Sequence, residues 1–550
     1  MPYIGRENYP YYQETLAEPS ALWSDLYALT MAQALWEDDR HNAQATFHGF
    51  IRTAPYDGQY LLTAGQNIVH EWMDKNWKFD EADIYTLAKK TIPGPDGTEH
   101  KLFKPEFLEM LKNAKLELTI DAMPEGELAF PAEPIFRVNG PLWQGLMVEA
   151  AILNTVNSQS NFATYASHLK TAAGGAPILE FGLRRAQAVG GLSSTRGAFV
   201  GGADISSNVW AERCYDIPTK GTMAHAFIMC YEDELTAFKA WAKGMPYNGI
   251  FLVDTYDTLH GVENAINVCK ENGLHLSGIR LDSGDLSYLS KEARKLLDAA
   301  GFGEAKITAS NDLDRATINA LKQDGAKIDY WTVGTALVTA KEQPGLGGVY
   351  KIGAVFDEKI SAKEVDAMRD AVREGKKSPD DIRKHARELM KLSGDAIKMS
   401  YPGELDVVRY LKSADSGQLY FDGGTILSNW QQDPIKYKNP KDEFSGVLTR
   451  DITSIQRDNA TMSKEFEKGT QAYHPLQRFF TKGKLVGNIE TVHQGRERGL
   501  QRMAMLEESH KRQLNPHRYV VGAEEELTDR QMKMARKLRN SSSVIAAQIK

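Results

Sequence analysis

Between residues 217 and 335 the chain repeats one pattern, in which a short apolar run is followed by a polar loop and then by apolar positions at helical spacing. Strands that alternate with helices in this way form parallel βα units. Five successive units favour a barrel over an open doubly wound sheet, although the pattern by itself is compatible with both. In either architecture, ligands bind beyond the carboxyl ends of the strands. The predicted strands are residues 217–224, 249–253, 277–281, 306–310 and 328–333.

The segments on either side of these units have a different pattern. Residues 1–150 mix helices with short strands punctuated by proline, and residues 404–436 are typical of two antiparallel strands around a Ser-Ala-Asp-Ser-Gly turn. Residues 357–395 carry mixed charges at helical spacing, which indicates a solvated insertion. We therefore expect a discontinuous α+β domain (1–150 and 404–480), an α/β barrel with the active site (151–356), a charged helical insertion (357–395) and a C-terminal helical segment (481–550).

Composition narrows the class of protein without naming a reaction. The 550 residues are 42% hydrophobic, and 66 basic against 73 acidic residues give a net charge of −7, which is typical of a globular protein and leaves no electrostatic footprint for nucleic acid. No apolar run is long enough to cross a bilayer, and the first twenty residues do not resemble a signal peptide. Cys214, Cys230 and Cys269 have no metal-ligand spacing and fit a reduced compartment. We expect a large cytoplasmic enzyme with neither a nucleic-acid nor a membrane partner.

The side chains expected at the strand ends mix fixed cations, carboxylates and hydroxyls. A phosphorylated substrate accompanied by Mg²⁺ needs this mixture, because guanidinium groups bind phosphate oxygens and carboxylates position the metal. Each residue also has a purely structural interpretation: an aspartate as a helix cap, a histidine as a core residue, an arginine pair as surface. Their common placement supports a site. They are Arg184, Arg185, Thr222, His225, Asp254, Asp257, His260, Arg280, Asp282, Asp285, Asn311, Asp312, Gly334 and Thr335.

Several long sequence blocks resemble the nicotinate phosphoribosyltransferase family of type II phosphoribosyltransferases. These are SDLYALTMAQALW, EFGLRRAQ, GGADISSNVWAERCYDIPTKGTMAHAF, FLVDTYDT, GIRLDSGDL and VGTALVT. The resemblance implies an irregular α/β barrel with a discontinuous α+β domain, in a homodimer whose active sites lie at the subunit interface. It also implies transfer of phosphoribosyl from 5-phosphoribosyl 1-diphosphate to nicotinate in NAD salvage, with Mg²⁺. The resemblance further implies that ATP is a co-substrate, hydrolysed through a phosphohistidine.

The same motifs imply roles for individual residues. His225 in GTMAH matches the phosphorylated histidine, and Tyr27, Thr222 and Arg280 match the nicotinate-binding positions. Ser400 stands where the family more often has threonine, in contact with phosphoribosyl diphosphate. The expected phosphoribosyl diphosphate-binding set, which joins motif matches to residues at strand ends, is Arg184, Arg185, Asp282, Gly334, Thr335 and Ser400.

The chemistry of the residues agrees with these roles but leaves alternatives open. Nicotinate is a flat anion, so Arg280 suits its carboxylate and Tyr27 offers a face for its ring. One alternative is the sister enzyme for nicotinamide or for quinolinate. A second is a barrel lyase or metal-dependent hydrolase that uses His260, Asp254 and Asp282, although the sequence has neither an HxH nor an HExxH pair. A third is a non-catalytic nucleotide-binding descendant.

Overall fold

The computed structural model describes residues 19–393, 399–457, 459 and 461–548. The chain divides into two compact units, which we describe separately. Unit 1 comprises Met1–Asn157, Leu346–Glu490 and Gln501–Lys550, and unit 2 comprises Ser158–Gly345 and Thr491–Leu500. Each unit is therefore assembled from segments that are distant in sequence.

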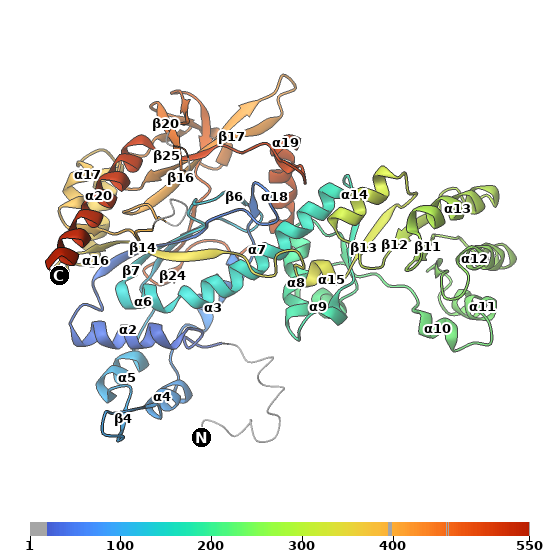
Figure 1. Ribbon diagram of the computed structural model, residues 1–550, viewed down its shortest axis with the longest axis horizontal. Coiled ribbons are helices and arrows are strands. Elements are labelled where there is room, and N and C mark those ends of the chain that lie inside the picture. Colours follow the sequence, from blue (N-terminus) through green and yellow to red (C-terminus); the bar gives the residue numbers. More distant parts are fainter. Residues whose placement is uncertain (1–18, 394–398, 458, 460, 549–550) are drawn as a thin grey trace. The chain divides into compact units, whose positions relative to one another are not determined.

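Unit 2 is built around a six-stranded parallel sheet with the order β10-β11-β12-β13-β8-β9 (Figure 1). The sheet curls into part of a barrel, and no ladder among the described residues joins β9 to β10. The predicted parallel α/β barrel is thus confirmed, in the form of a half-barrel. Its strands are β8 (Ile178–Glu180), β9 (Ile205–Ser206), β10 (Ile250–Leu252), β11 (Gly278–Leu281), β12 (Lys306–Ala309) and β13 (Tyr330–Val333).

Four of the predicted strands correspond to β10, β11, β12 and β13. The prediction of a strand at 217–224 is wrong, because this segment makes only one isolated bridge, between Ser206 and Thr219. Pro218 removes a backbone donor there, and only the two ends of the run, Ile217 and Met223, are buried. The sheet is completed by β8 and β9 instead, which are too short to show a pattern in the sequence.

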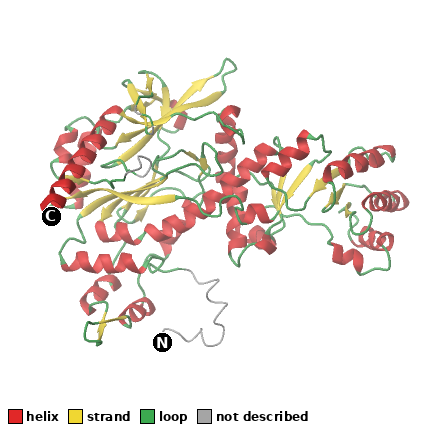
Figure 2. Cartoon of the chain, in the orientation of Figure 1, coloured by secondary structure: helices red, strands yellow, loops and turns green. Residues whose placement is uncertain are grey.

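Helices flank this sheet (Figure 2). They include α11 (Glu234–Gly244), α12 (Thr258–Asn272), α13 (Leu286–Ala299) and α14 (Arg315–Gln323). Each begins after an aspartate whose carboxylate accepts a hydrogen bond from a backbone N–H of the first turn: Asp233, Asp257, Asp285 and Asp314, respectively. For Asp257 and Asp285 the purely structural interpretation is therefore confirmed, and their side chains act as helix caps.

Unit 1 contains an antiparallel seven-stranded sheet with the order β15-β14-β1-β7-β5-β23-β24. Helices α2 (Leu26–Glu37), α3 (Gln66–Lys75) and α6 (Leu142–Met147) share its core, in which Phe47, Trp72 and Trp143 are buried. The strands are β1 (Gln44–Ile51), β5 (Thr119–Ala122), β7 (Phe136–Pro141), β14 (Gly348–Phe356), β15 (Ala386–Glu388), β23 (Gln477–Thr481) and β24 (Lys484–Leu485).

A second sheet of unit 1 has eight strands in the order β18-β19-β22-β16-β17-β25-β20-β21. The antiparallel pair predicted around the turn at 413–417 is confirmed as β16 and β17. The C-terminal segment supplies α18 (Val492–Met505), α19 (Glu508–Lys511) and α20 (Glu525–Gln548) but also a strand, β25, that pairs in parallel with β17. The strands are β16 (Leu405–Ser413), β17 (Leu419–Ser428), β18 (Ile435–Tyr437), β19 (Gly446–Leu448), β20 (Ile452–Gln456), β21 (Ser463–Phe466), β22 (Gln471–Tyr473) and β25 (Val521–Glu524).

The charged insertion is helical, as expected, but it is not only a solvated surface. It contains α16 (Ala362–Arg373) and α17 (Pro379–Arg383), followed by β15. Val365, Val372 and Ile382 are fully buried in a cluster with Trp430. The mixed charges lie on the remaining faces, so the pattern of charges alone concealed an apolar face.

No helix among the described residues combines the length and the apolar character that crossing a bilayer requires.

Candidate active site

His225 lies at the first residue of the short helix α10 (His225–Met229), beside carboxylates from two strand ends. Its Nδ1 is 3.1 Å from the Thr255 hydroxyl, and its Nε2 is 3.6 Å from Asp282 Oδ2 and 4.0 Å from Asp254 Oδ1. The side chain is 38% exposed. His225 is therefore a ring held at an accessible edge, and its interpretation as a sealed core histidine is wrong.

Arg280, on β11, directs its guanidinium toward Asp282, one of the two carboxylates beside His225. Its Nε donates to the Ser310 hydroxyl at 2.9 Å and one Nη donates to Asp282 Oδ1 at 2.8 Å. Burial raises the pKa of Asp282, but hydrogen bonds from Ser310 and Arg280 and the charges of Arg280 and His225 outweigh burial and hold the pKa below its ordinary value. Asp282 is thus an ion-pair partner and not a helix cap.

The Asp254 carboxylate, after β10, forms hydrogen bonds with the residues that follow β11. Its Oδ2 accepts hydrogen bonds from the Asp282 backbone N–H at 2.8 Å and from the Ser283 hydroxyl at 2.6 Å. Its side chain is fully buried, and Oδ1 has no hydrogen-bond partner among the described residues. A buried carboxylate oxygen without a partner is costly, so Oδ1 is available to a cation or to a donor of a bound ligand.

Arg184 and Arg185 lie in a single 3₁₀ turn, Leu183–Arg185, directly after β8. Buried Glu180 shapes this turn by accepting hydrogen bonds from the Gly182 N–H and from the Thr195 and Ser206 hydroxyls. Both arginine side chains are exposed and make neither a hydrogen bond nor an ion pair with any other described residue. Two unpaired guanidinium groups at a strand end suit a polyanion.

Gly334 and Thr335 follow β13, the strand next to β8 in the sheet. A Cβ atom at Gly182 would lie 2.8 Å from the Gly334 carbonyl oxygen and 2.3 Å from the Val338 side chain. Only glycine therefore fits where these two strand ends meet. Thr222, in the loop before α10, is half-buried, and its hydroxyl donates to the Met223 carbonyl at 3.3 Å.

Tyr27 and Ser400 belong to unit 1. Tyr27, on α2, is 48% exposed and donates to Glu149 Oε2 at 3.1 Å. Partial burial and the Glu149 carboxylate raise its pKa to about 12, so the phenol keeps its proton at neutral pH. The interpretation of Tyr27 as a core aromatic is wrong, because nearly half of the side chain faces solvent.

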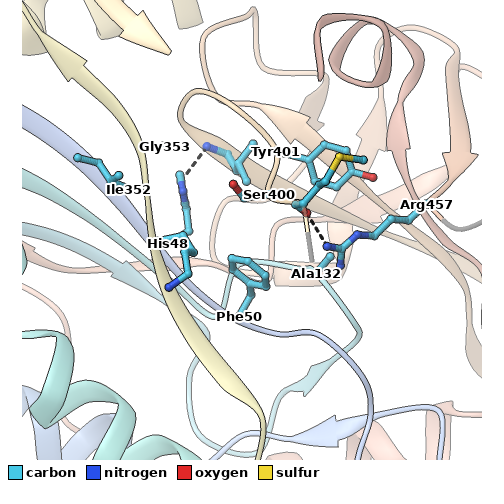
Figure 3. Close-up of a pocket in the computed structure, with 11 residues that line it drawn as sticks. His48, Phe50, Ala132, Ile352, Gly353, Ser400, Tyr401 and Arg457 are labelled. Carbon is cyan, nitrogen blue, oxygen red and sulfur yellow. Dashed lines mark hydrogen bonds between the residues drawn. The ribbon is translucent and has the colours of Figure 1, made fainter. Parts of the chain in front are cut away.

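Ser400 lines a pocket that it shares with two cations (Figure 3). Its hydroxyl accepts from the Lys391 N–H at 3.2 Å, and Arg457 donates to the Met399 carbonyl at 2.6 Å. Lys351 also lines this pocket. Its ammonium group donates to the Tyr350 carbonyl on the same strand, and it has no ion-pair partner among the residues described. Among the described residues, the charged side chains that line the pocket are cations, with no aspartate or glutamate, which favours an anionic ligand.

Several residues that contribute to these groups were not among the predicted site residues. Thr255 and Ser310 had a usable signal, since both lie at predicted strand ends. Glu180 lay at the end of a strand that the pattern did not show. Lys351, on β14, and Arg457, just after β20, had no local signal, because they reach the pocket of Ser400 from segments that are distant in the sequence.

The chain is similar to known proteins over most of its length. Residues 22–157 match the model of the nicotinate phosphoribosyltransferase N-terminal domain, and residues 445–531 match that of the C-terminal domain. The chain is 42% identical to nicotinate phosphoribosyltransferase of Bacillus subtilis over 64% of this chain and 69% of that protein. It is 30% identical to the Caenorhabditis elegans enzyme over 94% and 93%, respectively.

The fold is also similar to solved structures. The crystal structure of human nicotinic acid phosphoribosyltransferase superposes with a TM-score of 0.70 at 24% identity, over 93% of this chain and 99% of that one. A nicotinate-nucleotide pyrophosphorylase from Pyrococcus furiosus gives a TM-score of 0.59 at 18% identity, over 88% and 95%. The fold is that of a type II phosphoribosyltransferase. Within that class, the chain belongs to the nicotinate phosphoribosyltransferase family.

Proposed function

We propose that the chain transfers the phosphoribosyl group of 5-phosphoribosyl 1-diphosphate to nicotinate and forms nicotinate mononucleotide and diphosphate. The observation that carries this proposal, beside membership of the family, is the group of His225, Arg280, Asp254 and Asp282 at the ends of β10 and β11. In this group, Arg280 offers a permanent positive charge for the anionic nicotinate ring, and His225 is an accessible histidine beside two carboxylates.

In the proposed reaction, the ring nitrogen of nicotinate attacks the anomeric carbon of the sugar. The bond from that carbon to the diphosphate oxygen breaks, and the electron pair leaves with diphosphate. Such substitutions pass through a transition state with oxocarbenium character. The protein's task is then to position both substrates and to neutralise the leaving diphosphate, for which Arg184 and Arg185 are unpaired among the described residues.

Arg280 supports the choice of the acid as substrate. Its contacts to Ser310 and Asp282 use Nε and one Nη, which leaves the other Nη for a ligand carboxylate. A guanidinium group offers a planar fork that matches a carboxylate. Tyr27 and Thr222 complete the proposed nicotinate contacts, as the family motifs imply.

His225 is proposed to accept the γ-phosphoryl group of ATP. A ring nitrogen attacks the γ-phosphorus, ADP leaves, and water later releases inorganic phosphate. Carboxylates lie 3.6 and 4.0 Å from Nε2 and flank the imidazole. Coupling to ATP would then tighten substrate binding and displace the equilibrium toward the nucleotide.

Mg²⁺ is proposed to accompany the diphosphate. Asp254 Oδ1, which lacks a partner among the described residues, and Asp282 Oδ2 are hard oxygen donors that fit this ion. No cluster of three or more histidine, cysteine, aspartate or glutamate side chains suited to a metal occurs in the part of the chain that the structure describes. The substrate's phosphate oxygens would therefore supply most of the coordination, and the ion would neutralise the leaving group.

The homodimer with active sites at the subunit interface, and the cytoplasmic location, also belong to this proposal, on the strength of the family resemblance. A dimer can be tested by light scattering of the purified chain. Mixing two variants that are impaired through changes in different units, such as Tyr27→Ala and His225→Ala, should restore part of the ATP-stimulated activity if each site draws on two chains.

Incubation with nicotinate, 5-phosphoribosyl 1-diphosphate and Mg²⁺ should yield nicotinate mononucleotide, and ATP should increase the yield. Nicotinamide should be a poor substrate, because a neutral amide does not need the Arg280 cation. Product chromatography with either substrate, with and without ATP, is the measurement. Preference for the amide would assign the chain to the sister activity, and turnover without the sugar diphosphate would indicate a lyase or hydrolase. The lyase or hydrolase hypothesis relies on His260, but this residue lies on the surface of α12 and pairs with Glu263.

Replacement of Lys351 by methionine should raise the KM for phosphoribosyl diphosphate roughly 10- to 100-fold, which corresponds to loss of one charge-assisted hydrogen bond. The reason is that Lys351 lines the pocket of Ser400 without an ion-pair partner among the described residues. Steady-state kinetics in both substrates is the measurement, and Lys436→Met, at an exposed position of β18, is the matched control. If the KM for phosphoribosyl diphosphate is unchanged in Lys351→Met, the proposal that this pocket binds that substrate is wrong.

A further inference from the structure

Arg369, on α16 of the charged insertion, reaches a buried carboxylate just before β16. Its Nε donates to Glu404 Oε2 at 2.7 Å, and one Nη donates to Asn139 Oδ1 at 3.0 Å. Glu404 is 1% exposed and Arg369 is 11% exposed. The insertion therefore supplies a cation to the interior of unit 1.

Glu404 depends on this cation more than on any other. Arg137 lies 3.8 Å from Glu404 but is closer to Asp121, at 3.0 Å, and to Asp406, at 3.4 Å. Burial raises the pKa of Glu404, but the charges of Arg369 and Arg137 and hydrogen bonds from neighbouring side chains lower it to about 2. Glu404 is therefore ionised at neutral pH, and a buried charge that loses its partner is strongly destabilising.

The anchored residue lies at the end of the segment that carries Ser400. Gly403 donates its N–H to the Gly353 carbonyl at 2.9 Å, and Leu389, just after β15, donates to the same carbonyl at 2.7 Å. Gly403 has a φ of +85°, and a Cβ atom there would lie 2.6 Å from Glu388 Oε1. The residue after β15 and the turn at Gly403 thus both bond to Gly353, which lines the same pocket as Ser400 (Figure 3).

We infer that the charged insertion positions the Ser400 segment to bind phosphoribosyl diphosphate, and that Arg369 does so through Glu404. The inference rests on the proposed function, in which Ser400 contacts that substrate. Arg369 is a positioning residue, since it touches Glu404 and Asn139 but does not line the pocket. Helices α16 and α17 are then part of the binding apparatus for one substrate only.

Arg369→Met should raise the KM for phosphoribosyl diphosphate roughly 10- to 100-fold, because a displacement of the order of 1 Å in a binding group has such effects. The KM for nicotinate should stay nearly constant. Steady-state kinetics in both substrates and calorimetric titration with phosphoribosyl diphosphate measure this. Lys363→Met, at an exposed position of the same helix, is the matched control and should match the wild type.

The double variant Arg369→Met/Glu404→Gln separates positioning from stability. Residues 369 and 404 are both uncharged in this variant, so neither leaves a buried charge without a partner. Its melting temperature should therefore recover toward the wild-type value, while its KM for phosphoribosyl diphosphate should stay raised. A single variant with lower melting temperature but unchanged binding of phosphoribosyl diphosphate would overturn the inference, as would equal changes in both KM values. Failure of the wild type to form nicotinate mononucleotide would instead contradict the proposed function, and the calorimetric titration would still test the inference.

Discussion

Replacement of His225 by alanine should abolish the stimulation of transfer by ATP and leave a slow transfer that is the same with and without ATP. The imidazole is the proposed acceptor of the γ-phosphoryl group, whereas the sugar–nitrogen bond forms without it. His225 suits this role because its ring is 38% exposed and is held between Thr255 and the carboxylates of Asp254 and Asp282. Initial rates at saturating nicotinate and phosphoribosyl diphosphate, with and without ATP, are the measurement.

The matched control is His260→Ala, because His260 lies on the surface of α12 in the same unit and pairs with Glu263. This variant should keep the wild-type response to ATP. Incubation with ATP labelled in the γ-phosphate should label the wild type and the control but not His225→Ala. If His225→Ala retains the ATP stimulation or the label, the phosphohistidine assignment is wrong.

Replacement of Arg280 by alanine should raise the KM for nicotinate about 30-fold or more, with a much smaller effect on the KM for phosphoribosyl diphosphate. Loss of one partner of a buried, hydrogen-bonded charge pair costs about 2–5 kcal/mol, and 1.4 kcal/mol corresponds to a tenfold change. The guanidinium is mostly buried and already oriented by Ser310 and Asp282, so little entropy is lost when it meets a carboxylate. Steady-state kinetics in each substrate measures the split.

Arg280→Lys is the informative companion, since it keeps the charge but loses the planar fork. It should recover part of the affinity for nicotinate. Arg294→Ala, which removes an arginine paired with Asp298 on α13, is the control for loss of an arginine in the same unit. Equal changes in the KM values of both substrates would contradict the role of Arg280 as the carboxylate-binding residue.

Much of the half-barrel and part of its site could be predicted from the sequence. Long helices with one apolar face and strands such as β11 and β12 are encoded by the spacing of neighbouring residues, so their patterns are visible locally. The rule that ligands bind at the carboxyl ends of parallel strands then led to Arg280 and Asp282, whereas His225 was placed at the end of a predicted strand, 217–224, that does not form. The same rule also included Asp257 and Asp285, which the structure shows to be helix caps.

Other parts of the fold and the site could not be predicted because their stability comes from distant contacts. Strands β8 and β9 have three and two residues, which is too short for a periodic signal. The run at 217–224 resembled a strand locally, but Pro218 and its exposed middle residues prevented it from joining the sheet. The buried face of the insertion was hidden by its charges until Val365 and Val372 packed against Trp430.

The sequence by itself determined the class of fold, the family and the strand-end residues, because each depends on residues that are neighbours in the chain. Only the tertiary structure decided which groups act on one another. Arg280 with Ser310, Arg457 with Met399, and Arg369 with Glu404 come from separate elements. Their pairing depends on strand register and on the burial of charge, since an ion inside a protein must find its partner wherever the packing places it.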